Sequence, residues 1–465
     1  MAKSSSSKRS TRKRVDRISG LPNDLLFRIL AFLPTRSAMA TSLLSHRWQY
    51  VWKGVPALNF FYDDANDIIY NCSSTEALEQ YRCLRYFMNR ALFQNRAPCL
   101  ERVDFFVLPV INENDREVWF KELSRRSIKE VNLFYDEWCD VPIMCLLDGA
   151  AGKHLVALRL HCMSFNIEVT FSSMPYLPNL EIVHLSRVEL DDGEPLRSLL
   201  CGCPRLRELV LSECSASALN LNLHCSTLKI LKFLDAVDTE ISIGVPNLEY
   251  FEYYNANDNF DTEFIDKPDY FRYLTTEMPC LAEVKIGSCD MKAARWADLF
   301  HKVRHVIKLN VSLGRFIDMD TTTMHFELPY FNRLKWLEID CYEEHSVLQT
   351  RMLLRHMPNC VSLIIRMLHP WTDNAYELKG WPAVDSFGLG SYIEYIEIEG
   401  FGRTRLKGVE LLRYLLVCCT RLKEMKLHLY DCPYSEQSPS LEQKNMMRKM
   451  IRKLPRPSGC KITIR

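Results

Sequence analysis

The sequence lacks any long apolar run, and no stretch approaches the roughly 18 apolar residues that a membrane-spanning helix needs. It also lacks an excess of charge of one sign, because 59 Lys and Arg face 58 Asp and Glu, which leaves a net charge of +1. Such a balance provides no bulk attraction for nucleic acids or acidic membranes. We therefore expect neither a nucleic acid nor a membrane among the partners.

The first 15 residues lack the apolar core of a secretory signal. They are rich in Ser, Lys and Arg, so residues 1–15 are predicted to form a disordered basic tail. The basic cluster within residues 8–14 suits a nuclear import signal and suits a solvated tail equally well. The expected localisation is the nucleus, the cytoplasm or both.

Motifs of metal binding and catalysis are missing as well. The 18 cysteines include no C-x-x-C pair, and in a reducing compartment they are expected to be thiols. No phosphate-binding loop, H-E-x-x-H or G-x-S-x-G sequence occurs. We expect no metal site, no cofactor and no catalytic residue, so the chain is predicted not to be an enzyme.

The most informative segment that is present spans residues 21–52, LPNDLLFRILAFLPTRSAMATSLLSHRWQYVW. Leu and Ile recur at helical spacing over residues 25–33, and Pro34 ends that helix. Thr35 is placed to cap a second helix. The spacing therefore predicts the first two of three short amphipathic helices.

A third helix is predicted between Ser45, its cap, and Gly54 just past its end, with Trp48, Val51 and Trp52 on one face. A unit of this size rarely folds without a disulfide, a metal or a partner. It is therefore either a helical cap on a larger core or a docking surface that another protein completes. Trp52 is expected to be internal.

The spacing LP-x-x-LL-x-x-IL-x-x-LP, followed by S-x-LS-x-RW-x-x-x-W, resembles an F-box over residues 16–58. The resemblance implies a non-catalytic module that binds a Skp-type adaptor and, through it, a cullin. Some residues of the motif must form the module's own core and others must contact the adaptor, and the sequence does not show which residue has which role. The residues implied on or behind the adaptor interface are Leu21, Pro22, Leu25, Ile29, Leu30, Leu33, Pro34, Leu43, Leu44 and Trp48.

From residue 100 onward a six-residue pattern returns thirteen times, with apolar residues at its first, fourth and sixth positions. The copies start 20 to 33 residues apart, from Leu100 to Leu422. Each predicts a short strand whose apolar face is covered only when neighbouring copies stack. This is the signature of leucine-rich repeats. Cys214 and Cys289 stand where such repeats place an inward side chain that bonds turn backbone.

Helical segments are predicted between the strands at 195–200, 347–354 and 411–416, and a longer helix at 74–95 precedes the first repeat. Two wide gaps, 254–270 and 368–391, are predicted to be loops inserted between repeats. Such loops often carry recognition, which makes Trp371, Tyr376 and Trp381 candidates for substrate contact. The alternative is that these aromatic side chains only pin the loop down.

The C-terminal region, from IEYIEIEGFGRTRLKGVELLRYLL to the end, resembles the FBD region of plant F-box repeat proteins. The resemblance implies a terminal cap, since an open repeat array would expose its core. The residues that carry it are Gly400, Gly402, Glu410, Tyr414, Leu415 and Leu416.

The predicted fold is α/β, a three-helix F-box followed by an irregular leucine-rich-repeat solenoid of horseshoe form. The expected domains are the tail at 1–15, the F-box at 16–58, a helical linker at 59–99, repeats at 100–385 and the FBD-like region at 386–465.

The resemblance implies the substrate-recognition subunit of a Skp-cullin-F-box ubiquitin ligase, in which the repeats bind a protein substrate that the sequence does not identify. Two alternatives stay open. One is a scaffold or regulatory binding protein outside any ligase. The other is a small-molecule sensor, to which Arg159, Arg187 and Arg207 would contribute.

Overall fold

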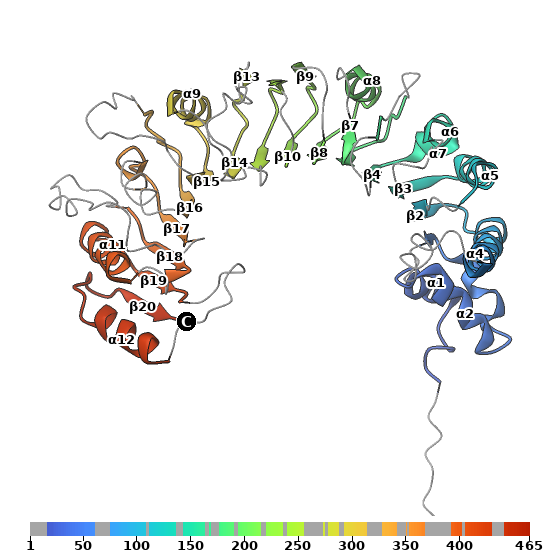
Figure 1. Cartoon of the computed structure of the whole chain (residues 1–465), viewed down its shortest axis with the longest axis horizontal. Helices are drawn as coiled ribbons and strands as arrows, with labels where there is room; N and C mark the ends of the chain where they lie inside the picture. Colours follow the sequence, from blue (N-terminus) through green and yellow to red (C-terminus); the bar gives the residue numbers. More distant parts are fainter. Residues whose placement is uncertain are drawn as a thin grey trace, which may run out of the picture. The chain divides into compact units, whose positions relative to one another are not determined.

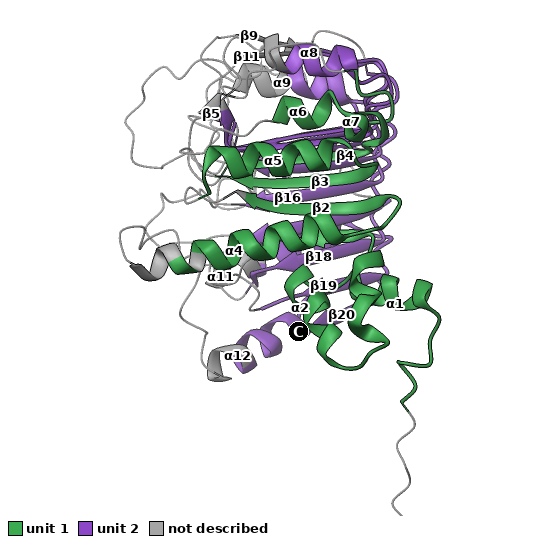
Figure 2. Cartoon of the chain, turned by 90° about the vertical axis from the view of Figure 1, so that its right-hand side faces the viewer, with its two compact units in different colours: residues 1–164, 175–180 green, residues 165–174, 181–465 purple. Residues whose placement is uncertain are grey.

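The structure is a computed structural model, and its backbone contacts divide the chain into two compact units (Figure 2). Unit 1 comprises residues 1–164 and 175–180, and unit 2 comprises 165–174 and 181–465. The residues that the structure describes are 16–60, 75–107, 111–135, 143–162, 167–168, 176–189, 194–214, 220–235, 240–254, 273–274, 278–287, 293–313, 328–341, 350, 353–367, 392–401, 405–429 and 441–465.

The F-box segment opens unit 1 with two α-helices, α1 (Asn23–Leu30) and α2 (Thr35–Ala40). Two 3₁₀ helices follow, η1 (Thr41–Leu43) and η2 (Trp48–Gly54), and η2 is the third helix that the sequence predicts. Three residues are a usual length for a 3₁₀ helix such as η1, whereas the seven residues of η2 are unusually many. The three aromatic and aliphatic residues expected on its face, Trp48, Val51 and Trp52, are all buried.

Two local predictions for this segment are corrected. Thr35 does not cap α2, because it is the first helical residue and its hydroxyl accepts a hydrogen bond from the backbone N–H of Asn59 at 2.7 Å. Gly54 is the last residue of η2, and a Cβ there would lie 2.4 Å from the Phe27 ring. The missing side chain of Gly54 lets the Phe27 ring pack against its backbone, and Gly54 does not end the helix in a left-handed conformation.

The rest of unit 1 alternates strands with helices in a parallel sheet of order β1-β2-β3-β4. Its helices lie along one side of these strands (Figure 1). The helix predicted at 74–95 is confirmed as α4. The elements are β1 (Ala57–Asn59), α4 (Thr75–Gln94), β2 (Leu100–Val107), α5 (Glu113–Ser124), β3 (Ile128–Tyr135), α6 (Ile143–Leu147), α7 (Ala150–His154) and β4 (Ala157–Cys162).

Unit 2 continues the same alternation with the strand order β6-β8-β10-β12-β14-β15-β16-β17-β18-β19-β20. Its described helices are α8 (Glu194–Gly202), α9 (Ala293–Val303), α11 (Arg405–Cys418) and α12 (Leu441–Arg452). The strands of this sheet are β6 (Ile182–Ser186), β8 (Glu208–Ser212), β10 (Ile230–Leu234), β12 (Tyr250–Tyr254), β14 (Glu283–Gly287), β15 (Lys308–Leu313), β16 (Trp336–Cys341), β17 (Ser362–Met367), β18 (Tyr395–Glu399), β19 (Glu424–Leu427) and β20 (Lys461–Ile464).

Two small sheets of unit 2 had no signal in the repeat pattern. One pairs β5 (Ile167–Glu168) with β7 (Val188–Glu189). The other has the order β13-β11-β9 and consists of β9 (Asn220–His224), β11 (Glu240–Gly244) and β13 (Tyr273–Leu274). These strands lie in the returns between repeats, outside the six-residue pattern, although β9 and β11 themselves alternate polar and apolar residues.

All thirteen strands predicted from the six-residue pattern are confirmed, and their apolar positions pair in register. On β16 and β17, for example, Leu337 pairs with Leu363 and Ile339 with Ile365, and all four are at most 1% exposed. The leucine-rich-repeat solenoid is therefore a stack of matching apolar rows, as the alternation requires. Strands β1 and β20 were not predicted, because β1 precedes residue 100 and β20 has Gly459 in place of the first apolar residue.

The turn cysteine is also confirmed where the structure describes it. Cys214 is buried, and its Sγ lies 3.4 Å from the carbonyl oxygen of Leu185 and 3.5 Å from that of Ser212. Burial raises the pKa of this thiol to about 11, so it stays protonated and available as a donor. Cys289 lies outside the described residues, as do the predicted loop at 368–391 and most of the predicted helix at 347–354. The predicted loop at 254–270 also lies outside them, except for Tyr254, which ends β12.

Asn95 joins the F-box to the first repeats within unit 1. Its amide donates to the carbonyl of Val55 at 2.8 Å, and its Oδ1 accepts from the backbone N–H of Ala97 at 3.1 Å and from Arg126 at 2.9 Å. The Asn95 side chain is buried, so water cannot replace it. Removing it would leave its hydrogen-bond partners unpaired.

We expect Asn95→Ala to lower the free energy of unfolding by about 1.5 kcal/mol, measured by chemical denaturation. The matched control is Asn247→Ala. Asn247 is exposed and makes one comparable bond to the Ser226 carbonyl at 2.7 Å, so its loss is expected to cost less than about 0.5 kcal/mol. Equal effects of the two substitutions would refute the proposed role of Asn95.

Candidate functional site

Part of the predicted adaptor-binding set forms the core of the F-box. Leu30 is 2% exposed and Trp48 5% exposed, and the Trp48 ring donates to the Ser19 hydroxyl at 2.8 Å. These two residues lie behind the surface and cannot contact a partner directly. The F-box core consists of Leu26, Leu30, Ala38, Trp48, Val51 and Val55.

The rest of the predicted set reaches the surface. Pro22 and Pro34 are exposed, and Leu21 is half-buried against the core. The exposed aliphatic residues are Leu25 (45%), Ile29 (44%), Leu33 (39%), Leu43 (88%) and Leu44 (68%). Large apolar side chains left this exposed on a small module suit a protein interface. Binding of an adaptor at this surface stays a prediction.

Phe32 is the residue that the motif did not identify. It is 90% exposed and stands in the turn after α1, between Ile29 and Leu33. It occupies a variable position of the motif, so only its aromatic character and its place in the turn before Pro34 could have indicated it. We name Leu25, Ile29, Phe32, Leu33, Leu43 and Leu44 the apolar F-box surface.

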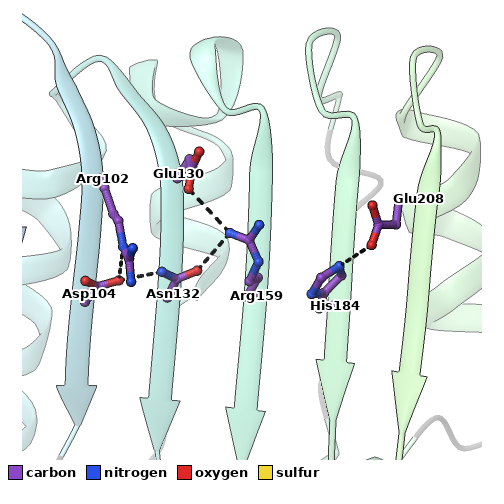
Figure 3. Close-up of polar contacts among 7 residues, drawn as sticks. All are labelled: Arg102, Asp104, Glu130, Asn132, Arg159, His184 and Glu208. Carbon is purple, nitrogen blue, oxygen red and sulfur yellow. Dashed lines mark hydrogen bonds and ion pairs between the residues drawn. The ribbon is translucent and has the colours of Figure 1, made fainter. Parts of the chain in front are cut away.

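In each unit, we call the face of the sheet opposite to the helices the open face. In unit 1 a polar network covers this face. Asp104 on β2 is 2% exposed, pairs with Arg102 at 2.8 Å and accepts from the Asn132 amide (Figure 3). Arg159 on β4 donates to Asn132 at 3.2 Å and lies 3.5 Å from Glu130 (Figure 3). Buried polar groups that satisfy each other in this way rigidify a surface.

An aromatic row adjoins that network on the same strands. Phe106, Phe134 and His161 stand opposite one another on β2, β3 and β4. Phe106 and Phe134 stack at 6.3 Å between ring centroids, and Phe134 and His161 at 4.6 Å. The three rings are half-buried, so they offer a partly exposed aromatic strip beside a charged network.

The open face of unit 2 is also rich in paired charges. His184 on β6 lies 3.0 Å from Glu208 on β8 (Figure 3). Further along, the Tyr250 ring on β12 lies between Lys232 at 5.2 Å and Lys285 at 5.7 Å. Its hydroxyl donates to Glu252 at 2.7 Å. Burial, followed by this bond to a carboxylate, raises the pKa of Tyr250, so the phenol stays protonated.

Arg366 on β17 is surrounded by three carboxylates. It lies 2.9 Å from Glu399 on β18, 3.5 Å from Asp340 on β16, and within ion-pair distance of Glu338 on β16. Burial raises the pKa of Asp340 to about 6, although the Arg366 charge opposes that shift. One cation therefore balances a cluster that is acidic at neutral pH.

A fourth polar group of the open face of unit 2 is centred on Glu397 of β18. Its carboxylate lies 2.7 Å from His428 and accepts from the Tyr395 hydroxyl, while Lys426 lies 4.9 Å from the Tyr395 ring centroid. Burial raises the pKa of Glu397, but the hydrogen bonds from Tyr395 and His428 outweigh it, and the net shift is downward. The open face of unit 2 thus carries acidic, basic and aromatic groups that contact one another within a strand and between neighbouring strands.

The arginines considered for a small-molecule pocket are each engaged with a carboxylate in their own unit. Arg159 contacts Glu130, Arg187 lies 2.8 Å from Glu213, and Arg207 lies 3.8 Å from Glu181. The three loop aromatics Trp371, Tyr376 and Trp381 lie outside the described residues, so their role stays a prediction.

Within the described residues, no group of three or more His, Cys, Asp and Glu side chains is arranged to hold a metal ion. None of the helices in that part of the chain combines the length and the apolar character needed to cross a bilayer.

Comparison with known proteins gives two family matches. The model of the F-box domain matches residues 18–58. The model of the repeats of the FBD-associated F-box protein At5g56370 matches residues 116–339. These ranges contain the apolar F-box surface and most of the strands described above.

Individual relatives come from Arabidopsis thaliana. The F-box/LRR-repeat protein At4g15060 is 30% identical over 374 residues, which cover 76% of this chain and 80% of that protein. The FBD-associated F-box protein At4g13985 is 24% identical over 444 residues, which cover 91% of this chain and 92% of that protein. The similarity therefore extends over nearly the whole chain.

Proposed function

The chain belongs to the F-box/LRR-repeat family that includes FBD-associated F-box proteins, and we propose that it is the substrate-recognition subunit of a Skp-cullin-F-box ubiquitin ligase. F-box domains generally bind Skp-type adaptors. The observation that carries the proposal is the exposure of Phe32 and Leu43, at 90% and 88%, on a module that has its own closed core. An adaptor that covers these side chains would gain the free energy of removing them from water.

The repeats would bind the protein substrate on the open face. Its strands come from many repeats, so a partner can be recognised by side chains spread over a wide area. Transfer of ubiquitin would be promoted by proximity, because the complex holds the substrate near an enzyme carried by another subunit. In this proposal the chain itself supplies no reacting group.

The proposal is tested by purifying the full-length chain from plant cells and probing for a cullin. We expect the cullin to co-purify with the wild-type chain and to be lost when the apolar F-box surface carries acidic substitutions. Recovery of the adaptor without any cullin would favour a scaffold or regulatory binding protein outside a ligase.

We expect a substrate-binding role of the open face to be visible in a trapping experiment. A chain with a disabled F-box should accumulate substrates, and adding Tyr250→Ala with Lys285→Glu should reduce their recovery by at least about tenfold, because both side chains lie on the open face. Recovery is measured by quantitative mass spectrometry.

The matched control for that experiment is Arg413→Glu, an exposed position on α11, on the helical side of unit 2. It should leave the recovered proteins unchanged. If the control reduces recovery as much as the open-face variant does, the substrate is not bound on the open face near Tyr250.

A further inference from the structure

The last helix and the last strand of unit 2 enclose a pocket of about 500 Å³. Three of its lining residues are arginines, three are isoleucines, and none is acidic. We call it the terminal pocket; it is lined by Arg448, Ile451, Arg452, Arg456, Ile462 and Ile464. Both contributing elements, α12 and β20, lie close to the C-terminus (Figure 1).

Ile462 and Ile464 of β20, which line the terminal pocket, continue the rows of buried apolar side chains that run across the sheet. Ile462 and Ile464 pair in register with Met425 and Leu427 of β19, which are fully buried. Ile462 and Ile464 themselves are half-buried, and among the described residues β20 is the last strand in the sheet order. The pocket therefore offers apolar surface where another strand would fit.

The backbone of β20 also offers a free edge. The N–H groups of Lys461 and Arg465 point toward β19. They donate to the carbonyl oxygens of Lys423, just before β19, and of Leu427, at 2.9 Å each. Backbone groups alternate in direction along a strand, so those of Ile462 and Ile464 point away from β19. Among the described residues no strand pairs with this edge. An unpaired edge of this kind is a template for an added strand.

The charge around the pocket is strongly one-sided. Residues 441–465 contain eight Lys and Arg and one Glu, a net charge of 8 − 1 = +7, whereas the whole chain carries +1. Within the described residues, no carboxylate forms an ion pair with Arg448, Arg452 or Arg456. Arg456 precedes Pro457, which favours extended backbone at Arg456.

We propose that the terminal pocket binds an extended acidic segment of a partner protein, which adds to β20 as a further strand. Its backbone would pair with the groups of Ile462 and Ile464, and its apolar side chains would cover those isoleucines. Its carboxylates would pair with Arg448, Arg452 and Arg456. The pocket isoleucines and the strand edge favour a peptide over a nucleic acid, because nucleic acid binding uses neither of them.

The experiment measures binding of a fluorescein-labelled peptide of eight alternating Glu and Val residues to the purified full-length chain, by fluorescence polarisation. We expect the wild-type chain to bind it and Arg452→Glu to weaken binding by at least about tenfold. The control Lys449→Glu makes the same charge change on an exposed position of α12 outside the pocket and should change the Kd less than about twofold.

A second peptide, with the same sequence but methylated at alternate backbone nitrogens, separates strand addition from charge attraction. It should bind at least about tenfold more weakly if a ladder forms with β20. Unchanged thermal unfolding of Arg452→Glu shows that the variant is folded; if it is not, Arg456→Glu takes its place.

Four results would overturn the proposal. They are no binding of the first peptide to the wild-type chain, equal losses for Arg452→Glu and Lys449→Glu, equal binding of the methylated peptide, and tighter binding of a single-stranded DNA octamer that displaces the peptide. The adaptor and cullin take no part in this assay, so its outcome is independent of the proposed ligase function.

Discussion

Replacing Phe32 and Leu43 together by Asp is expected to weaken binding of the Skp-type adaptor by at least about 100-fold, measured by calorimetry or by capture of the purified adaptor. Both side chains are almost fully exposed, at 90% and 88%, so the free chain loses no packing. Each would bury a large apolar surface in the complex, and a carboxylate there would be desolvated without a partner. The free energy of unfolding should change by less than about 0.5 kcal/mol.

The matched control is Tyr86→Asp, a similarly exposed aromatic residue on α4 in the same unit, 69% exposed. It should leave adaptor binding unchanged. Leu30→Asp is not a substitute for the double variant, because Leu30 is 2% exposed and a buried charge there would unfold the module. Wild-type affinity of a folded Phe32→Asp, Leu43→Asp chain would show that the apolar F-box surface does not bind the adaptor.

Asp340→Asn is expected to change the pH dependence of stability. Burial raises the pKa of Asp340 to about 6 in the folded chain, above the ordinary value of 3.8 expected after unfolding. Between these values the folded state binds more protons than the unfolded state, so stability falls as the pH rises. The amide of the variant has no proton to lose in this range. The stability of the variant relative to wild type should therefore rise by about 2 kcal/mol from about pH 4.5 to about pH 7.5.

Chemical denaturation at a series of pH values tests this expectation. The double variant Asp340→Asn, Glu399→Gln is a second test, because the Glu399 charge contributes to the raised pKa of Asp340. Once Asp340 is an amide, this contribution is absent, so the pH dependence of the double variant should resemble that of Asp340→Asn. A stability difference for Asp340→Asn that stays constant over the pH range would exclude the protonation of Asp340 in the folded chain.

The repeats could be predicted from sequence because their signal is physical and recurrent. A strand with apolar residues at alternate positions has one buried face. Thirteen copies of such a strand at similar spacing indicate a repeat fold. The strands β5, β7 and β13 could not be predicted in this way, because each has only two residues. β9 and β11 alternate polar and apolar residues, but they lie outside the six-residue pattern from which the strands were predicted.

The adaptor-binding set shows where sequence alone reached its limit. Leu25, Leu26, Ile29 and Leu30 form one wide apolar stripe on α1, and the pattern treats them alike. Only the packing of η2 against this helix separates the buried pair, Leu26 and Leu30, from the exposed pair, Leu25 and Ile29. That division depends on tertiary contacts with Trp48, Val51 and Val55, which no local spacing encodes.

The polar groups of the open face had a weaker signal. Lys232 and Glu252 are twenty residues apart, yet strand pairing places them opposite each other, and their charged groups lie 3.5 Å apart. Their positions follow from the repeat register once the strands are aligned. The pKa of Asp340 could not be anticipated, because it depends on how deeply neighbouring chain covers that carboxylate.

Strict pairing between repeats has a consequence for how this family could change its targets. Strands in a sheet are about 4.8 Å apart, so Lys232 and Lys285, two strands apart in one row, stand about 10 Å apart whatever the length of the intervening returns. A one-residue insertion inside a strand would turn the following side chains over, whereas insertions in a return leave this grid intact. New binding preferences are therefore expected to arise by substitution of individual residues in the strands, whose positions in the sheet are fixed. The returns can vary in length without changing these positions.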